Sequence, residues 1–168
     1  MKSLGAPIVS FEEFLALKPK LGKIVLVSGG FDPIHPGHIS NIQEAKKLGD
    51  TLVVVVNGDA FLRDKKGTPF QDLKTRCAIV SAVQGADYII PFEIKNDKSI
   101  CKALEYVQPH IFAKGGDRSG PSTIPEWPIC QQLGIEVVFN VGLDKQWSSS
   151  DFLKEWVEHS TQAQNSRS

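Results

Sequence analysis

The sequence has no excess of charge of either sign. Its 168 residues include 19 lysines and arginines and 19 aspartates and glutamates, so the formal net charge at pH 7 is zero. Proteins that coat nucleic acid or bind anionic membrane surfaces rely on a surplus of positive charge. We therefore expect neither nucleic acid nor a membrane among the partners of this protein.

The sequence also lacks long apolar runs and is poor in cysteine. No stretch approaches the length of a transmembrane helix, and the start, MKSLGAPIVSFEEF, lacks the apolar core of a signal peptide, which favours a cytoplasmic location. The three cysteines, Cys77, Cys101 and Cys130, are widely spaced and match no CxxC metal pattern. A disulfide framework is therefore unexpected, and all three are predicted to be buried thiols.

Short apolar runs alternate with segments of helical period along the chain, without an internal repeat or a linker. We predict strands over residues 23–28, 51–57, 87–92, 110–114 and 135–140, and helices over 10–17, 38–49, 72–83, 97–107, 125–134 and 149–160. This alternation predicts an α/β fold: a Rossmann-like, doubly wound sheet of five parallel strands in the order 3-2-1-4-5, with helices on both faces. Residues 1–160 are expected to form one domain, and the polar tail 161–168 to be disordered.

Four unusual segments each follow a predicted strand. They are SGGFDPIHPGH (28–38), NGD (57–59), KGGDR (114–118) and WSSS (147–150). Parallel sheets bind ligands beyond the carboxyl ends of their strands, where the strand order reverses. Because all four segments are expected at that edge, the sequence predicts a ligand site there, across the ends of the first and fourth strands.

The first segment has the chemistry of a phosphate site. Gly29 and Gly30 allow a close approach of the backbone, and the free N–H groups of the helix opened by Pro36 favour an anion. His35 and His38 are three residues apart, so both imidazoles are expected to point the same way. The segment lacks the further ligands, at the usual spacing, that a metal site requires. It also contains neither the GxGxxG motif of dinucleotide-binding proteins nor a P-loop motif.

The pattern G-x-F-D-x-x-H-x-G-H, which starts at Gly29, resembles the signature of the cytidylyltransferase-like (HxGH) nucleotidyltransferases. The resemblance spans about residues 23–155, and the motifs are most similar to the group of heptose-1-phosphate adenylyltransferases and glycerol-phosphate cytidylyltransferases. It implies transfer of AMP or CMP from ATP or CTP, accompanied by Mg²⁺, to a sugar phosphate or polyol phosphate, with release of pyrophosphate. Alternatives are a flavin- or nicotinamide-nucleotide adenylyltransferase and a non-catalytic nucleotide-binding relative. Relatives of this kind are commonly homodimers, so a homodimer is expected.

The resemblance also implies roles for individual residues. The implied catalytic residues are His35, His38 and Lys66, with Lys66 on a flexible loop, RDKKGTPFQD. The implied nucleotide-binding residues are Ser28, Gly29, Gly30, Phe31, Asp32, Gly37, Lys114, Gly115, Gly116, Asp117, Ser148, Ser149 and Ser150. The implied acceptor-binding residues are Asp59, Arg76 and Arg118.

Several of these residues have simpler interpretations. Asp32 is suited to fixing its loop by accepting hydrogen bonds from backbone N–H groups. Ser148 and its neighbours fit a helix cap, and Arg76 fits an ion pair on a helix. Relatives that use CTP carry an arginine near the position of Leu143, where this chain has only Lys145 close by. The choice between ATP and CTP therefore stays open.

Overall fold

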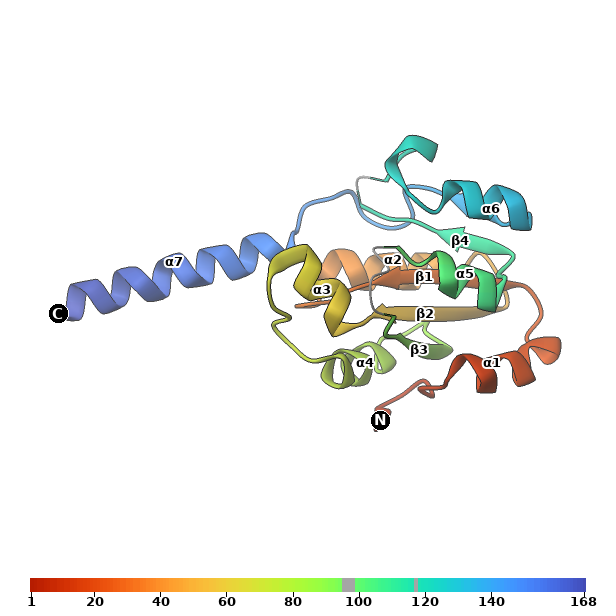
Figure 1. Ribbon diagram of the computed structural model, residues 1–168, viewed down its shortest axis with the longest axis horizontal. Coiled ribbons are helices and arrows are strands. Elements are labelled where there is room, and N and C mark those ends of the chain that lie inside the picture. Colours follow the sequence, from red (N-terminus) through yellow and green to blue (C-terminus); the bar gives the residue numbers. More distant parts are fainter. Residues whose placement is uncertain (95–98, 117) are drawn as a thin grey trace.

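The computed structural model describes residues 1–94, 99–116 and 118–168. Within these residues one parallel sheet of five strands has the order β3-β2-β1-β4-β5, as predicted (Figure 1). Val25 of the central strand pairs with Leu52 on one side and with Ile111 on the other, so the strand order reverses beside β1. The strands are β1 (Ile24–Gly29), β2 (Thr51–Asn57), β3 (Tyr88–Phe92), β4 (Ile111–Ala113) and β5 (Glu136–Val138).

Helices cover both faces of the sheet, because the strands carry apolar side chains on both. Val53 and Val55 of β2 belong to one buried cluster, together with side chains of α1, α5 and α6. Val54 and Val56 point to the other face and pack with side chains of α2 and α4. The helices are α1 (Phe11–Leu17), α2 (Pro36–Lys46), α3 (Asp59–Lys66), α4 (Leu73–Ser81), α5 (Cys101–Val107), α6 (Trp127–Leu133) and α7 (Ser149–Arg167), with 3₁₀ turns η1 (Lys18–Lys20) and η2 (Pro121–Thr123). No helix in the described part of the chain is both long enough and apolar enough to cross a membrane.

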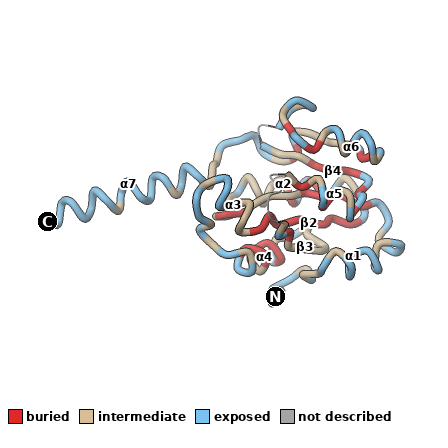
Figure 2. The backbone as a smooth tube through the Cα atoms, in the orientation of Figure 1, coloured by how far each residue is buried: buried red, intermediate tan, exposed pale blue. Residues whose placement is uncertain are grey.

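The structure differs from the sequence-based prediction in α3 and α7. The segment after β2, predicted to be a flexible loop, forms α3 up to Lys66, where Gly67 ends the helix with a φ of 89° that favours glycine. The last helix continues to Arg167 because no glycine or proline follows Ser149, so the tail predicted to be disordered is helical. This helix projects away from the sheet (Figure 1), and almost all of it is exposed (Figure 2).

The cysteines are free thiols. Cys77 and Cys130 are buried as predicted, and burial raises the pKa of Cys77 to about 12 and that of Cys130 to about 11. Cys101, also predicted to be buried, is partly exposed, because it opens the first turn of α5. Residues 95–98, part of which belongs to the helix predicted over 97–107, lie outside the described residues.

Candidate active site

The loop between β1 and α2 holds two histidines face to face. Nδ1 of His35 accepts a hydrogen bond from the backbone N–H of His38 at 3.4 Å, and Nδ1 of His38 accepts one from the backbone N–H of His35 at 3.3 Å. The rings are stacked with centroids 3.7 Å apart, pointing the same way as their spacing predicts. Because each Nδ1 is an acceptor, the proton of each neutral ring is on Nε2, which can donate to a ligand.

The surroundings keep this pair neutral. Burial, together with the nearby His35, Lys65 and Lys66, lowers the pKa of His38 to about 3. Burial also lowers the pKa of His35. A bound polyphosphate would offset the repulsion from the two lysines, so these rings are suited to donate hydrogen bonds to phosphate oxygens.

The carboxylate of Asp32 holds in place the loop between β1 and α2 that carries the two histidines, called here the histidine loop. Its two carboxylate oxygens accept hydrogen bonds from the backbone N–H groups of Phe70 and Gln71, each at 2.7 Å, and its Oδ2 lies 2.9 Å from Nζ of Lys66. The carboxylate is buried, with a side-chain exposure of 1 %. Its oxygens are engaged within the protein and fix the loop, while the implied role of Asp32 in nucleotide binding stays a prediction. Phe31 is buried beside it, with its ring against that of His38.

The structure gives Arg76, whose implied role is to bind the acceptor, a set of partners within the protein. Its side chain is fully buried and donates hydrogen bonds to the carbonyl oxygens of Gly30, Asn57 and Gln71. It also forms an ion pair with Asp59, at 2.6 Å between Nη2 and Oδ1. The donors of the arginine that the structure shows therefore join the ends of β1 and β2 to the segment before α4 and to α3, and Asp59 is the partner of Arg76.

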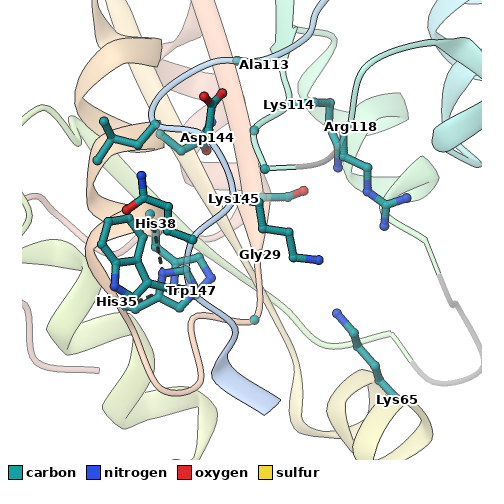
Figure 3. A pocket seen from close by; sticks show the side chains of 18 residues that line it. Gly29, His35, His38, Lys65, Ala113, Lys114, Arg118, Asp144, Lys145 and Trp147 are labelled. Atoms are coloured by element: carbon teal, nitrogen blue, oxygen red, sulfur yellow. Dashed lines mark hydrogen bonds between the residues drawn. The ribbon is translucent and has the colours of Figure 1, made fainter. Parts of the chain in front are cut away.

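A cavity of about 280 Å³ opens at the carboxyl ends of β1 and β4, at the sheet edge that the four segments predict. Figure 3 shows His35, His38 and Trp147 on one side of it and Lys65, Lys114 and Arg118 on the other. The predicted residues that line it are Ser28, Gly29, Gly30, His35, Gly37, His38, Lys114, Gly115, Gly116 and Arg118. Asp117, predicted with them, lies outside the described residues.

Close approaches explain the glycines of this cavity. A Cβ on Gly37 would lie 3.0 Å from Cε1 of His35 and 3.6 Å from the ring of Trp147. A Cβ on Gly115 would lie 2.7 Å from Nδ2 of Asn41, which donates a hydrogen bond to the carbonyl of Val141. A side chain at either position would push into the wall of the cavity, so both positions favour glycine.

A second cavity, of about 190 Å³, adjoins the first. The two share a wall made of Ser28, Gly29, Gly30, Lys65, Lys114 and Arg118. The far side of the second cavity is formed by residues from other elements, among them Asn57 at the end of β2 and Glu126 at the start of α6. The arrangement is therefore two compartments on either side of a cationic wall.

The serines and Lys66 do not line the main cavity or the second cavity. Ser148 caps α7 by accepting a hydrogen bond from the N–H of Asp151, and the hydroxyl of Ser149 donates to the carbonyl of Pro33 at 2.7 Å. A small cavity of about 70 Å³ beside His38 is lined by Lys66, Ser149 and Ser150, among others. The structure therefore brings these residues next to the histidine pair but not into the main cavity.

Sequence reasoning assigns no role to several residues that line the main cavity, among them Asn41, Lys65 and Lys145, and suggests only for Trp147 that it borders the base. The resemblance points to Lys66 rather than to its neighbour Lys65, although successive residues of a helix point in directions about 100° apart. Trp147 adjoins the serine cluster, and its ring faces that of His35 at 6.4 Å. Its position beside the serines is the one signal that points to it in the sequence.

Comparison with known proteins decides the family. A model of the cytidylyltransferase-like family matches residues 26–159. This chain belongs to the cytidylyltransferase-like family. It is 38 % identical over 117 residues to the bifunctional protein HldE of Hahella chejuensis, an alignment that covers 68 % of this chain and 24 % of that protein. The HldE protein of Nitrosococcus oceani is 38 % identical over 122 residues, an alignment that covers 69 % of this chain and 25 % of that protein, so the chain spans about a quarter of the length of these curated relatives.

Solved structures agree with this assignment. The lipopolysaccharide core biosynthesis protein from Thermoplasma volcanium has a TM-score of 0.62 and 32 % identity, and the alignment covers 73 % of this chain and 99 % of that one. Pantothenate synthetase from Thermus thermophilus, at a TM-score of 0.57 and 15 % identity, shares the fold (88 % and 67 % of the two chains). The chain is thus a member of the cytidylyltransferase-like family with a Rossmann-like fold.

The side chains of this cytidylyltransferase-like chain fit a metal ion that arrives with its substrate. Among the described residues no group of three or more His, Cys, Asp or Glu side chains could enclose a metal ion. The main cavity offers the carboxylate of Asp144 and otherwise mainly donors and cations. This donor set fits a Mg²⁺ ion that enters with a triphosphate and is held mainly by phosphate oxygens and water.

Proposed function

We propose that this enzyme transfers AMP or CMP from ATP or CTP to the phosphate of a sugar or polyol phosphate. An oxygen of the acceptor phosphate bonds to the α-phosphorus while the bond from that phosphorus to the β-bridging oxygen breaks, and pyrophosphate leaves with that oxygen. One observation carries the proposal: a stacked histidine pair lies across one cavity from Lys65, Lys114 and Arg118 (Figure 3). Similarity to a lipopolysaccharide core biosynthesis protein favours a sugar phosphate as the acceptor.

The residues would contribute position and charge rather than a covalent intermediate. His35 and His38 donate hydrogen bonds to the transferring phosphate and to the leaving pyrophosphate, where negative charge increases. Lys65, Lys114 and Arg118 neutralise the two substrates that meet at their shared wall. Burial lowers the pKa of Lys114, which leaves its ammonium weakly solvated and dependent on an anionic partner.

The phosphates extend from the main cavity toward α7. Lys66, Ser149 and Ser150 border the small cavity beside His38, and we assign the β- and γ-phosphates to this side. The nucleoside then occupies the main cavity between Gly115 and Trp147. Mg²⁺ would accompany the triphosphate as part of the substrate and would neutralise its charge.

The experiment is a panel that measures pyrophosphate release. ATP, CTP, GTP and UTP are each combined with glucose 1-phosphate, mannose 1-phosphate, glycerol 3-phosphate, FMN and nicotinamide mononucleotide, with Mg²⁺ throughout. We expect release with one triphosphate and a sugar or polyol phosphate, and a loss of about 100- to 1,000-fold in His38→Asn, which removes one donor to the developing charge. Unchanged melting of His38→Asn at pH 7 is the control for folding.

The panel also separates the alternatives. Release with FMN or nicotinamide mononucleotide, and not with the sugar and polyol phosphates, would replace this proposal by a flavin- or nicotinamide-nucleotide adenylyltransferase. Binding of a triphosphate without release in any combination would favour a non-catalytic relative.

A further inference from the structure

Two residues that line the second cavity each carry a buried side-chain oxygen atom without a partner. Oε2 of Glu126 and Oδ1 of Asn57 accept no hydrogen bond from any residue that the structure describes. Glu126 is only 5 % exposed and Asn57 only 6 %, and both line this cavity. A buried acceptor without a donor costs about 1–3 kcal/mol, and more when it is charged. Two such atoms in one cavity therefore point to a ligand that supplies donors.

Neighbouring contacts hold the side chain of Glu126 and the backbone of Asn57 in place. The other carboxylate oxygen of Glu126, Oε1, accepts a hydrogen bond from the backbone N–H of Ile100 at 3.4 Å. The backbone carbonyl of Asn57 accepts a hydrogen bond from buried Arg76. Asn57 also lies in the parallel pairing between β2 and β3, opposite Phe92. The carboxylate of Glu126 and the backbone that carries the Asn57 side chain are therefore in place before a ligand enters.

The charges of the cavity orient that ligand. Lys65, Lys114 and Arg118 form the wall shared with the main cavity, and the carboxylate of Glu126 lies on the far side. A phosphate is attracted to the shared wall and repelled by Glu126. A molecule with a phosphate at one end and hydroxyl groups at the other satisfies both sides, because hydroxyls donate to carboxylate and amide oxygens.

We propose that Glu126 and Asn57 select the acceptor by accepting hydrogen bonds from its hydroxyl groups, which restricts this compartment to polyhydroxylated phosphates. The inference rests on the proposed function for one point, the assignment of the triphosphate to the histidine side and of the acceptor to the second cavity. Glu126 is then a specificity-determining residue that contacts the substrate away from the reacting phosphorus.

The test compares ligands that differ mainly in hydroxyl groups, and in the glycerol 3-phosphate pair only in them. Calorimetry without triphosphate measures the binding of glucose 1-phosphate and mannose 1-phosphate against cyclohexyl phosphate, and of glycerol 3-phosphate against propyl phosphate. In the unmodified protein we expect at least one hydroxylated ligand to bind about tenfold or more tightly than the ligand without hydroxyl groups with which it is paired. A hydrogen bond to a charged group contributes a free energy of this size. In Glu126→Gln this preference should shrink severalfold, and in Glu126→Leu it should vanish. The matched control is Glu136→Gln, which changes an exposed glutamate of β5.

A structural role of Glu126 makes the opposite prediction. If Glu126 served only as a counterion for Lys114, Glu126→Leu would lower the melting temperature and would weaken both members of each ligand pair equally. A selective role predicts an unchanged or higher melting temperature, because an unsatisfied buried carboxylate is removed. No preference in the unmodified protein, a preference that survives in Glu126→Leu, or no binding of any of these ligands would overturn the inference.

The two proposals can fail separately. A hydroxyl preference that depends on Glu126, in a protein that releases no pyrophosphate in the panel, would remove the proposed reaction and keep this binding site. Pyrophosphate release with affinities and KM values that do not depend on Glu126 would keep the reaction and remove the site.

Discussion

The environment of His38 keeps its imidazole neutral, so that the ring donates a hydrogen bond without carrying a positive charge. In the free protein its pKa of about 3 leaves it neutral at neutral pH, and the same is favoured for His35 by burial. An unfolded chain places histidine near its ordinary pKa of about 6.5. The unfolded state therefore binds more protons than the folded state between about pH 3 and about pH 6.5, and stability falls as the pH falls through this window.

This difference predicts how stability depends on pH. Between about pH 7 and about pH 5 the contribution of His38 should fall by at most about 2 kcal/mol. His38→Asn keeps an acceptor at the position of Nδ1 and removes the titrating group, so its free energy of unfolding should fall less over the same interval. Urea unfolding of both proteins at the two pH values measures this. Parallel losses in both would show that His38 is not the source.

Lys65 and Lys66 form a natural matched pair. Lys65 lines both the main cavity and the second cavity, whereas Nζ of Lys66 is 2.9 Å from the buried carboxylate of Asp32. We expect Lys65→Ala to slow turnover by about 100-fold or more with an unchanged melting temperature, because it removes a charge near the developing negative charge. Lys66→Ala should also lower the free energy of unfolding, by about 1–3 kcal/mol, because Asp32 loses a partner.

Kinetics and urea unfolding of the two variants decide the assignment. A Lys66→Ala protein with unchanged stability and crippled turnover, beside an active Lys65→Ala protein, would restore the role that the resemblance implies for Lys66. The position of the lysines could not be predicted from the sequence, since it depends on the helical phase of α3, a helix that the sequence does not predict.

The sequence revealed the residues of the site that have an unusual local pattern. The histidines and glycines of residues 28–38 lie where the pattern predicts. Glu126 and Asn57 have no such pattern: a glutamate before a helix and an asparagine at a strand end are common, and their meaning comes from burial without a partner. Burial of this kind depends on contacts between distant elements, which a single sequence does not display.

At the scale of elements, the site depends on how the ends of β1 and β2 are joined. One arginine of α4 holds the carbonyl of Gly30 after β1, the carbonyl of Asn57 at the end of β2 and the carboxylate of Asp59 at the start of α3. Asp32 connects the histidine loop to residues 70 and 71 in the same way. Two buried charges thus position segments that are far apart in the sequence.

Replacement of this arginine should lower the stability of the fold and should act on binding only through that loss. Arg76→Ala leaves three carbonyls and Asp59 without their donor, and breaking a buried ion pair costs about 3–5 kcal/mol. We expect a loss of this size in the free energy of unfolding, measured in urea. Arg63→Ala, at an exposed position of α3, is the control and should change stability by less than about 0.5 kcal/mol. An Arg76→Ala protein of normal stability with weakened acceptor binding would instead support the originally implied role.

Helices and strands could be predicted from the sequence where the hydrophobic period agrees with the burial of the residues. The strand predicted over 51–57 coincides with β2, whose residues are all buried, and the capping box of Ser10 and Glu13 starts α1 as expected. The failures have physical causes. In α3, most residues are charged and the helix is short, so its period is weak. In α7, the sequence turns polar after Ser160 without any residue that ends a helix, so composition was a poor guide.

At the scale of the molecule, α7 begins at the candidate active site and then extends into solvent. Its first turn belongs to the site: Ser149 donates to the carbonyl of Pro33, and the ring of Phe152 lies 6.3 Å from that of His35. Further along, Trp156 and Val157 are more than half exposed. The homodimer expected from the resemblance stays a prediction. If two copies associate, we expect these exposed apolar side chains to lie in the contact between them.

Removal of residues 161–168 tests which part of α7 matters. These residues are exposed, and the side-chain hydrogen bonds that the structure shows for them reach no further than four residues along the same helix. A chain that ends at Ser160 should therefore keep its melting temperature, its free energy of unfolding within about 0.5 kcal/mol, and its rate of pyrophosphate release. Melting curves at several protein concentrations and sedimentation of both chains provide the measurement. A lower, concentration-dependent melting temperature of the shortened chain would contradict this expectation and would show that the end of α7 packs against a second copy.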